Sequence, residues 1–362
     1  MKSVLIVIGT RPEAIKLAPI LVEINKNKFF INKVCVTKQH TDILDSFLLD
    51  LKINVDYQLK PLKKGSNLHQ IAAHILSGLE EILIKAKPDL VLVQGDTTTA
   101  FAATLAAFYS HIPVAHIESG LRTNNLYAPW PEEAHRVLSD KLSTYLFTPT
   151  LEAKNNLITE GISPKKIWVV GNTSIDAIRL VHKGLKPSRY TKELSIVVTV
   201  HRRENQGRQL IEICKALYVI AKQFPEVKIR FLLHPNPAVR NVVIDKLSKI
   251  INIELIEPKN HISFVQLLDS CSFIMTDSGG LQEEAPFLGK PVLVLRDTTE
   301  RVESLQAGTA RLIGTEASNI IDSCKELLKK PDVIKTMSKK HYPYGDGYAA
   351  KRIVDILATK LK

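Results

Sequence analysis

Short apolar runs alternate with longer amphipathic stretches from one end of this chain to the other. A run of about five apolar residues fits a buried strand, and an amphipathic stretch fits a helix that covers one face of a sheet. Strands joined by helices pair in parallel, because the helix returns the chain to the end where the previous strand began. The alternation therefore predicts an α/β protein with parallel sheets, and 362 residues are enough for about two domains.

The predicted strands fall into two series. The first covers residues 4–8, 33–37, 90–94, 114–117, 145–147 and 167–170. The second covers residues 196–200, 228–233, 253–256, 273–276 and 292–295. The first series ends in the polar turn Gly171-Asn172, so we expect one α/β domain over residues 1–171 and a second over residues 172–348. A last helix over residues 349–362 has an apolar face, whose partner is not visible in the sequence.

Composition excludes several classes of protein. Hydrophobic residues make up 45% of the chain, and no apolar run approaches the roughly 20 residues of a membrane span. The N-terminal apolar run ends at Gly9-Thr10-Arg11, too early for a secretory signal, so we expect a cytoplasmic protein. The four cysteines are far apart and form no C-x-x-C pair, which predicts separate buried thiols rather than a zinc site or disulfides.

The net charge of +12 raises the possibility of a nucleic-acid partner. The lysines are spread along the predicted surface helices, and no recognition-helix or RNA-binding motif accompanies them. We therefore expect no nucleic acid, and a basic surface that helps to attract an anionic substrate.

The stretch from residue 273 to residue 309 reads as a strand, a Ser-Gly-Gly turn, a short helix and a second strand. Gly279 and Gly280 let a ligand approach the backbone, and the helix start behind them points free N–H groups at an anion such as phosphate. Glu284 follows one turn later, where its carboxylate can accept hydrogen bonds from both ribose hydroxyls. A tight structural turn is the alternative, but the charged residues crowded around Ser278 favour a nucleotide site.

Ionisable side chains also follow the strands of the first series, at the ends where open parallel sheets bind ligands. Arg11 and Lys16 suit a diphosphate, although a solvated helix start explains Lys16 adequately. Asp96, Glu118 and Glu132 each have a structural alternative, such as a helix cap or a favourable charge at a helix start. Three carboxylates on one rim together indicate proton transfer at a carbon atom.

In the second series, His201 and His234 follow strands, and a core histidine with a satisfied hydrogen bond is the structural alternative for both. Neither a G-x-G-x-x-G fingerprint nor a P-loop nor an H-E-x-x-H motif occurs. The residues therefore give no sign of a nicotinamide cofactor or a metal.

Several motifs, in the same order, closely resemble those of the non-hydrolysing UDP-N-acetylglucosamine 2-epimerases over essentially the whole chain. They are GTRPEAIKLAP, GDTTT, HIESGLRT, PWPEEAHR, VTVHRREN, TDSGGLQEEAPFLGKPVLVLRDTTER, AGT and HYPYGDGYAAKRI. The resemblance implies two Rossmann-like domains that face a cleft, in the glycosyltransferase B-type fold. It implies interconversion of UDP-N-acetylglucosamine and UDP-N-acetylmannosamine by elimination of UDP to 2-acetamidoglucal and re-addition, without any cofactor, in polysaccharide biosynthesis.

The resemblance also assigns roles by motif position. The catalytic positions are Asp96, Glu118, Glu132 and His201. The positions that contact UDP or the substrate are Arg11, Lys16, Ser278, Gly279, Gly280 and Glu284. A second, activating UDP-N-acetylglucosamine is implied at Gln39, His40, Gln70, Arg203 and His234. Helix 349–362 would pack back on the first domain, and the protein would be a homodimer.

Other functions remain open at this stage. A hydrolysing relative would release UDP and free N-acetylmannosamine, and an epimerase of a related UDP-2-acetamido sugar would share the same motifs. A glycosyltransferase would need an acceptor, and a nucleotide-sugar sensor would have little need for three carboxylates on the rim.

Overall fold

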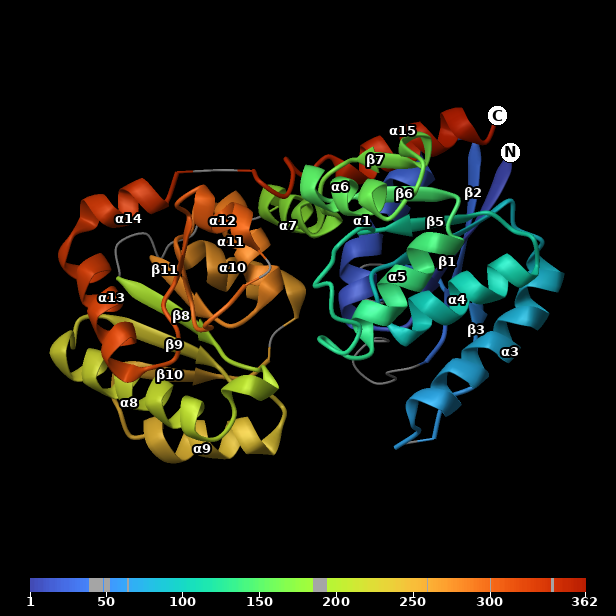
Figure 1. Cartoon of the computed structure of the whole chain (residues 1–362). Coiled ribbons are helices and arrows are strands. Elements are labelled where there is room, and N and C mark those ends of the chain that lie inside the picture. The colour runs from blue at the N-terminus through green and yellow to red at the C-terminus, as the bar shows by residue number, and fades with distance from the viewer. Residues whose placement is uncertain are drawn as a thin grey trace. The chain divides into compact units, whose positions relative to one another are not determined.

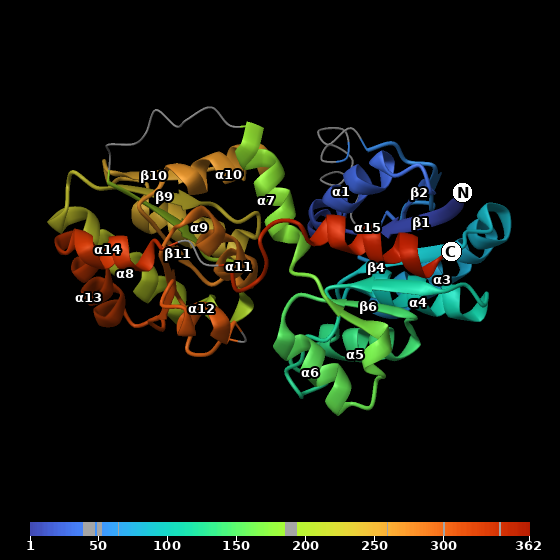
Figure 2. The same cartoon turned by 90° about the horizontal axis from the view of Figure 1, so that it is seen from above.

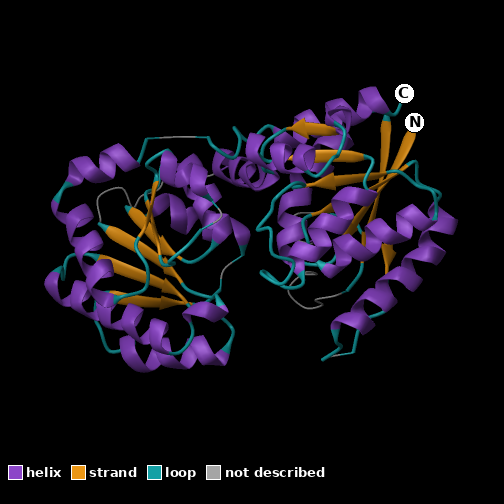
Figure 3. Cartoon of the chain, in the orientation of Figure 1, coloured by secondary structure: helices purple, strands orange, loops and turns teal. Residues whose placement is uncertain are grey.

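The structure, a computed structural model, describes residues 1–38, 48, 53–63, 65–184, 194–258, 260–299, 301–339 and 342–362. The chain divides into two compact units: unit 1 is Met1–Arg179 with Tyr344–Lys362, and unit 2 is Leu180–Pro343. The turn Gly171-Asn172 lies inside unit 1, just before helix α7 (Thr173–Gly184). Each unit contains a parallel sheet with helices packed against it, so the α/β prediction is confirmed (Figures 1 and 3).

Unit 1 has a seven-stranded sheet in the order β3-β2-β1-β4-β5-β6-β7, whose neighbouring strands run parallel. Its strands are β1 (Lys2–Ile8), β2 (Phe30–Val36), β3 (Tyr57–Gln58), β4 (Leu90–Gln94), β5 (Val114–Ile117), β6 (Tyr145–Thr148) and β7 (Ile167–Val169). Helix α7 begins in unit 1 and ends in unit 2, since the division falls after Arg179. The other helices of unit 1 are α1 (Arg11–Lys26), α3 (Leu68–Ala86), α4 (Thr98–Tyr109), α5 (Glu132–Leu142), α6 (Leu151–Thr159), η1 (Pro164–Lys166) and α15 (Ala349–Lys360).

Both faces of strand β1 are covered. Ile6 packs into the cluster that contains residues of α1 and α15, and Leu5 packs into the opposite cluster with residues of α3 and α4. This explains why β1 reads as a continuous apolar run instead of an alternating one. Ile353 and Leu357 of α15 share the first cluster with Leu17 of α1, and Figure 2 shows the two helices side by side. The last helix therefore packs on unit 1, although it follows unit 2 in the sequence.

Unit 2 has a six-stranded parallel sheet in the order β10-β9-β8-β11-β12-β13. Its strands are β8 (Ser195–Thr199), β9 (Lys228–Leu232), β10 (Ile253–Ile256), β11 (Phe273–Thr276), β12 (Val292–Val294) and β13 (Ala310–Leu312). Its helices are η2 (Arg203–Asn205), α8 (Arg208–Gln223), α9 (Pro237–Leu247), α10 (His261–Ser270), α11 (Gly279–Leu288), α12 (Val302–Gln306), α13 (Ala317–Lys329) and α14 (Pro331–Met337).

In each sheet the strand order reverses once, next to the first strand of its series. β2 lies on one side of β1 and β4 on the other, and β9 and β11 flank β8 in the same way. A crevice opens at such a switch point, because the connections on its two sides leave the sheet in opposite directions. The turns after β1 and β4, and those after β8 and β11, therefore lie at the positions where parallel sheets bind ligands.

Two short strands were absent from the sequence prediction. β3 has two residues and β13 has three, with Arg311 in its middle, so neither forms an apolar run. Both lie at sheet edges and pair with a single neighbour, where burial imposes less of a pattern on the sequence. All of the predicted strands are present, with shifts of a few residues at their ends.

The four cysteines are buried, and none of them is in a disulfide, as predicted. Within the described parts of the chain, no helix is both long enough and apolar enough to cross a membrane.

We predict that Leu357→Ala destabilises unit 1 by about 2–5 kcal/mol, because it leaves a cavity between α15 and α1. Both tryptophans, Trp130 and Trp168, belong to unit 1, so tryptophan fluorescence in urea follows its unfolding. Leu151→Ala, at a side chain that is 61% exposed, is the control and should change stability by less than about 0.5 kcal/mol. Equal effects of the two substitutions would contradict the packing of α15.

Candidate active site

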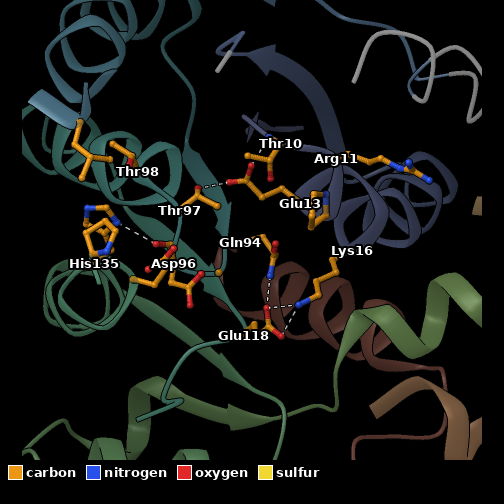
Figure 4. A pocket seen from close by; sticks show the side chains of 15 residues that line it. Thr10, Arg11, Glu13, Lys16, Gln94, Asp96, Thr97, Thr98, Glu118 and His135 are labelled. Carbon is orange, nitrogen blue, oxygen red and sulfur yellow. Dashed lines mark hydrogen bonds and ion pairs between the residues drawn. The ribbon is translucent and has the colours of Figure 1, made fainter. Parts of the chain in front are cut away.

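A cavity of about 610 Å³ lies at the switch point of the unit 1 sheet. It is lined by the turns that follow β1 and β4, and by residues after β5 and at the start of α5 (Figure 4). The five residues of unit 1 predicted to be catalytic or to contact the substrate line it: Arg11, Lys16, Asp96, Glu118 and Glu132. The structure thus brings together side chains from four separate stretches of sequence.

The turn between β1 and α1 is held by a buried carboxylate. Glu13 accepts hydrogen bonds from the backbone N–H groups of Gly9 (3.0 Å) and Thr10 (2.5 Å), and Thr10 in turn caps α1. The hydroxyl of Thr97, in the turn after β4, donates to Glu13 at 2.6 Å. Burial raises the pKa of Glu13 to about 6, although these donors act in the opposite direction. Glu13 therefore joins the two turns that supply Arg11 and Asp96.

Glu118 lies in a dense set of hydrogen-bond donors. Lys16 Nζ is 2.6 Å from both of its carboxylate oxygens, Asn172 Nδ2 donates to Oε1 at 2.8 Å, and the Gln94 amide donates to Oε2. The backbone of Glu118 is left-handed, with φ +66°, a conformation that costs energy for a residue with a side chain. The side chain is only 8% exposed. A strained backbone, combined with hydrogen bonds to both carboxylate oxygens, is typical of a residue whose position matters for function.

Asp96 lies at the end of the turn after β4, where Arg136 Nη2 donates to its carboxylate at 2.5 Å. Its backbone carbonyl accepts from His135 Nδ1 at 3.0 Å. The cap of helix α4 is Thr97, so the alternative that Asp96 serves as the helix cap is wrong. Burial lowers the pKa of His135, whose ring stacks on Phe101.

Glu132 and Glu133 begin helix α5, as the sequence suggested, but their environments differ. Glu132 lines the cavity. Glu133 is buried and accepts from the backbone N–H groups of Thr123 (2.8 Å) and Asn124 (3.1 Å), so it fixes the loop before the helix. The helix start therefore combines a residue directed to the site with one that supports the loop.

In unit 2 the predicted residues gather around Asp277, at the end of β11. This buried carboxylate lies 2.8 Å from His201 Nδ1, and it accepts from the Asn205 amide at 2.9 Å. Burial alone would raise the pKa of Asp277, but the His201 side chain and the backbone N–H groups of Arg202 and His201 outweigh it and lower this pKa. The His201 side chain is 42% exposed, so it is not the core histidine of the structural alternative. The ring of His234 lies 6.1 Å from that of His201.

Ser278 follows Asp277 and precedes α11, which starts at Gly279. A side chain at Gly279 would meet the Arg301 guanidinium at 2.9 Å, so the guanidinium lies directly beside this helix start. Arg301 also pairs with Glu283 at 3.0 Å. Ser278, Gly279 and Gly280 thus form a helix start with a cation beside it, which suits a phosphate, and Glu284 follows in the second turn of α11.

The positions implied for a second ligand are only partly described. Gln39 and His40 lie outside the described residues. Gln70 belongs to the capping box of α3, because its side chain accepts from the N–H of the N-cap residue Asn67 at 3.0 Å. Arg203 belongs to η2 and follows β8.

Sequence reasoning missed several residues of the site. Gln94, Asn172 and Arg136 contact predicted residues, and Glu13 joins the turns that supply Arg11 and Asp96, but none of the four carried a role in the prediction. Arg136 stands four residues after Glu132 on one helix, so the helical period was a usable signal for it. No comparable signal exists for Asn172, which reaches Glu118 across the sheet. Among the described residues, no group of three His, Cys, Asp or Glu side chains could hold a metal ion.

The two parallel sheets with their switch-point residues define a two-domain α/β protein of the glycosyltransferase B type. The Anabaena protein HepE shares this fold at 14% identity, with a TM-score of 0.64. The family model described as UDP-N-acetylglucosamine 2-epimerase matches residues 22–358, and the chain belongs to this family.

Two similar proteins illustrate the match. The UDP-N-acetylglucosamine 2-epimerase of Neisseria meningitidis is 47% identical, with 98% of this chain and 99% of that one aligned. A crystal structure of the N. meningitidis enzyme bound to UDP-GlcNAc has a TM-score of 0.93 over 99% of this chain and 100% of that one. The enzyme of Methanocaldococcus jannaschii, solved with UDP-GlcNAc and UDP, is 34% identical, with a TM-score of 0.83 and 99% of both chains covered.

We predict that protonation of Glu13 stabilises the fold. Its pKa of about 6 exceeds the value of 4.5 for an unperturbed glutamate, so this contribution is present below pH 4.5 and is lost as the pH rises through 6. Glu13→Gln keeps every hydrogen bond if the Thr97 hydroxyl turns to accept. Between a pH well below 4.5 and a pH well above 6, the free energy of unfolding of the wild type should fall by about 2 kcal/mol relative to that of the variant.

The control for this measurement is Glu81→Gln, at an exposed position on α3. Its pH profile in urea unfolding should follow that of the wild type. Parallel profiles for wild type and Glu13→Gln would show that the Glu13 carboxyl is not perturbed.

Proposed function

We propose that this protein interconverts UDP-N-acetylglucosamine and UDP-N-acetylmannosamine without hydrolysing either one. The observation that carries the proposal is the convergence of Arg11, Lys16, Asp96, Glu118 and Glu132 on one cavity. Membership of the family gives independent support, because relatives at 47% identity are UDP-N-acetylglucosamine 2-epimerases by name.

The reaction inverts the configuration at C2 of the sugar, whose hydrogen is only weakly acidic. It therefore needs a base, an acid and groups that stabilise the UDP leaving group. We infer that a carboxylate removes the C2 proton while the C1–O bond to UDP breaks, which gives 2-acetamidoglucal and UDP. A proton then returns to the opposite face of C2, and UDP adds back to C1. The sequence of steps is redox-neutral, and positioned acids and bases of ordinary side chains suffice for it.

The carboxylates of unit 1 suit the proton transfers. Asp96 and Glu118 each lie beside a cation: Arg136 Nη2 is 2.5 Å from the Asp96 carboxylate, and Lys16 Nζ is 2.6 Å from that of Glu118. The Lys16 ammonium has two competing partners in this proposal, the Glu118 carboxylate and the diphosphate. Movement of Lys16 to the diphosphate as the C1–O bond breaks would leave Glu118 freer to exchange a proton.

The helix start in unit 2 suits the nucleotide. Backbone N–H groups at Gly279 and Gly280 would bind the diphosphate, and Glu284 would accept from the ribose hydroxyls. His201, oriented by Asp277, would donate to the leaving phosphate. The homodimer implied by the family resemblance stays a prediction, which light scattering on the purified protein tests.

We predict that Asp96→Asn, Glu118→Gln and Glu132→Gln each abolish turnover in a coupled epimerase assay, because each removes a group that exchanges the C2 proton. UDP affinity, measured by calorimetry, should change by less than about threefold, since none of these carboxylates favours an anionic ligand. Glu152→Gln, in the exposed first turn of α6, is the matched control and should keep full turnover. Wild-type turnover in any one of the three variants would remove its catalytic role.

Arg11→Ala and Glu284→Ala, in contrast, should weaken UDP binding in the same calorimetric measurement. Each removes a charge-assisted contact to UDP, so UDP affinity should fall about 10- to 100-fold. Unchanged affinity would exclude the residue from the nucleotide site.

A time course in deuterated water, followed by NMR with UDP-N-acetylglucosamine alone, tests the reaction itself. We expect UDP-N-acetylmannosamine that carries deuterium at C2, because the abstracted proton exchanges with solvent before it returns. Accumulation of UDP and free N-acetylmannosamine would instead identify a hydrolysing enzyme. Absence of any change would point to another UDP-2-acetamido sugar or to an acceptor requirement.

A further inference from the structure

His116 is a fully buried histidine next to the candidate site that the proposed reaction does not use. It lies in β5, between its register neighbours Val93 of β4 and Leu146 of β6, and its side chain has no exposed surface. The turn that carries Asp96 begins directly after β4.

Both ring nitrogens of His116 face hydrogen-bond acceptors. Nδ1 lies 2.7 Å from Asp140 Oδ1, and Nε2 lies 2.7 Å from the backbone carbonyl oxygen of Gly95. A carboxylate and a carbonyl cannot donate, and a neutral imidazole has only one N–H group. In a neutral ring, the nitrogen without a proton would therefore point its lone pair at an acceptor oxygen, which is a repulsive contact. Both contacts are satisfied only when both nitrogens carry a proton.

The surrounding charges compensate a buried cation. Asp140 on α5 also pairs with Arg122 at 2.8 Å, and Arg122 pairs with Glu160 at 2.5 Å. Two positive side chains thus face two negative ones, and the Gly120 N–H group donates to Asp140 as well. Asp96, in the turn after β4, adds a further negative charge near the ring. Burial alone would lower the pKa of His116, but Asp140 and the Gly95 carbonyl outweigh it and raise it.

The Gly95 carbonyl is one of several groups that anchor the turn at residues 95–97. His135 binds the carbonyl of Asp96, and Glu13 binds the hydroxyl of Thr97. His116 holds the carbonyl immediately before Asp96, and Gly95 needs a left-handed backbone there, with φ +73°. We propose that His116 is a doubly protonated, permanently charged histidine that positions Asp96 through the Gly95 carbonyl. The second half of this inference rests on the proposed function, whereas the charge state does not.

The charge state is tested on the unmodified protein by ¹⁵N NMR of labelled histidine at pH 8. The His116 ring is assigned through contacts of its protons to Val93 and Leu146. We expect both nitrogens to be protonated, at a pH where an ordinary histidine with a pKa of about 6.5 is neutral. One protonated and one bare nitrogen would overturn the inference, whatever reaction the protein catalyses.

Asp140→Asn separates charge from position. The new amide can donate to Nδ1, so a neutral ring with its proton on Nε2 keeps the bond to Gly95. We expect the doubly protonated signal to disappear in this variant. Its persistence would mean that Asp140 is not the counter-ion, and would contradict the inference.

The positioning role is tested by His116→Gln, whose side chain can donate to Gly95 or to Asp140 but not in the geometry of a ring that bridges both. We expect kcat to fall about 10²-fold with KM within about threefold, because a displaced Asp96 affects the chemical step more than binding. The matched control is His74→Gln, which also removes a histidine bond to a carbonyl oxygen, that of Lys60 at 2.8 Å, but on α3. Its kcat should stay at the wild-type value.

Asp140→Asn gives a second functional comparison that does not depend on the folding of His116→Gln. Because it keeps the Gly95 contact, its kcat should stay well above the roughly 10²-fold loss expected when that contact is removed. A folded His116→Gln with wild-type kcat, or an Asp140→Asn variant that loses activity only through KM, would contradict positioning. A wild-type protein with no epimerase activity would refute the proposed function instead, and would leave the NMR result standing.

Discussion

The structure depends on one topological constraint, the reversal of strand order beside β1 in unit 1 and beside β8 in unit 2. Parallel strands deliver the residues that follow them to a single edge of the sheet, and the reversal opens space there because neighbouring connections diverge. In unit 1 this places the turns after β1 and β4 next to each other, so Glu13 can reach Thr97 from another part of the chain. The site is a consequence of that placement.

A site built in this way contains buried ionisable side chains. Glu13, His116 and Asp140 are fully or almost fully buried, yet each contacts several complementary groups. Such groups contribute little net stability compared with apolar side chains, but leaving one unpaired is expensive. They therefore favour a single arrangement of the turns, which is what proton transfer at carbon requires of its carboxylates.

Each unit has a buried carboxylate near its switch point, and the groups that surround the two carboxylates differ. In unit 1, Glu118 is surrounded by the cation Lys16 and by side-chain amides. In unit 2, Asp277 orients His201 and ties the end of β8 to the turn after β11. A buried carboxylate at a switch point, bonded across the neighbouring strand, is the shared element. The carboxylate of unit 1 suits the reacting sugar, and that of unit 2 holds a histidine beside the helix start suited to phosphate.

The sequence by itself determined the α/β class, most of the strands and the candidates Asp96, Glu118 and Glu132, because apolar runs and the polar residues that end them are local signals. The family resemblance added the roles of those residues. The tertiary structure decided the partners: Asn172 and Gln94 on Glu118, Arg136 on Asp96, and His116 between Gly95 and Asp140. It also decided the edge strands β3 and β13 and the partner of α15, which packs on α1 of the domain where the family resemblance had placed it. These contacts join residues far apart in the chain, and packing in three dimensions selects them. Among them, only Arg136 had a local signal, its helical spacing from Glu132.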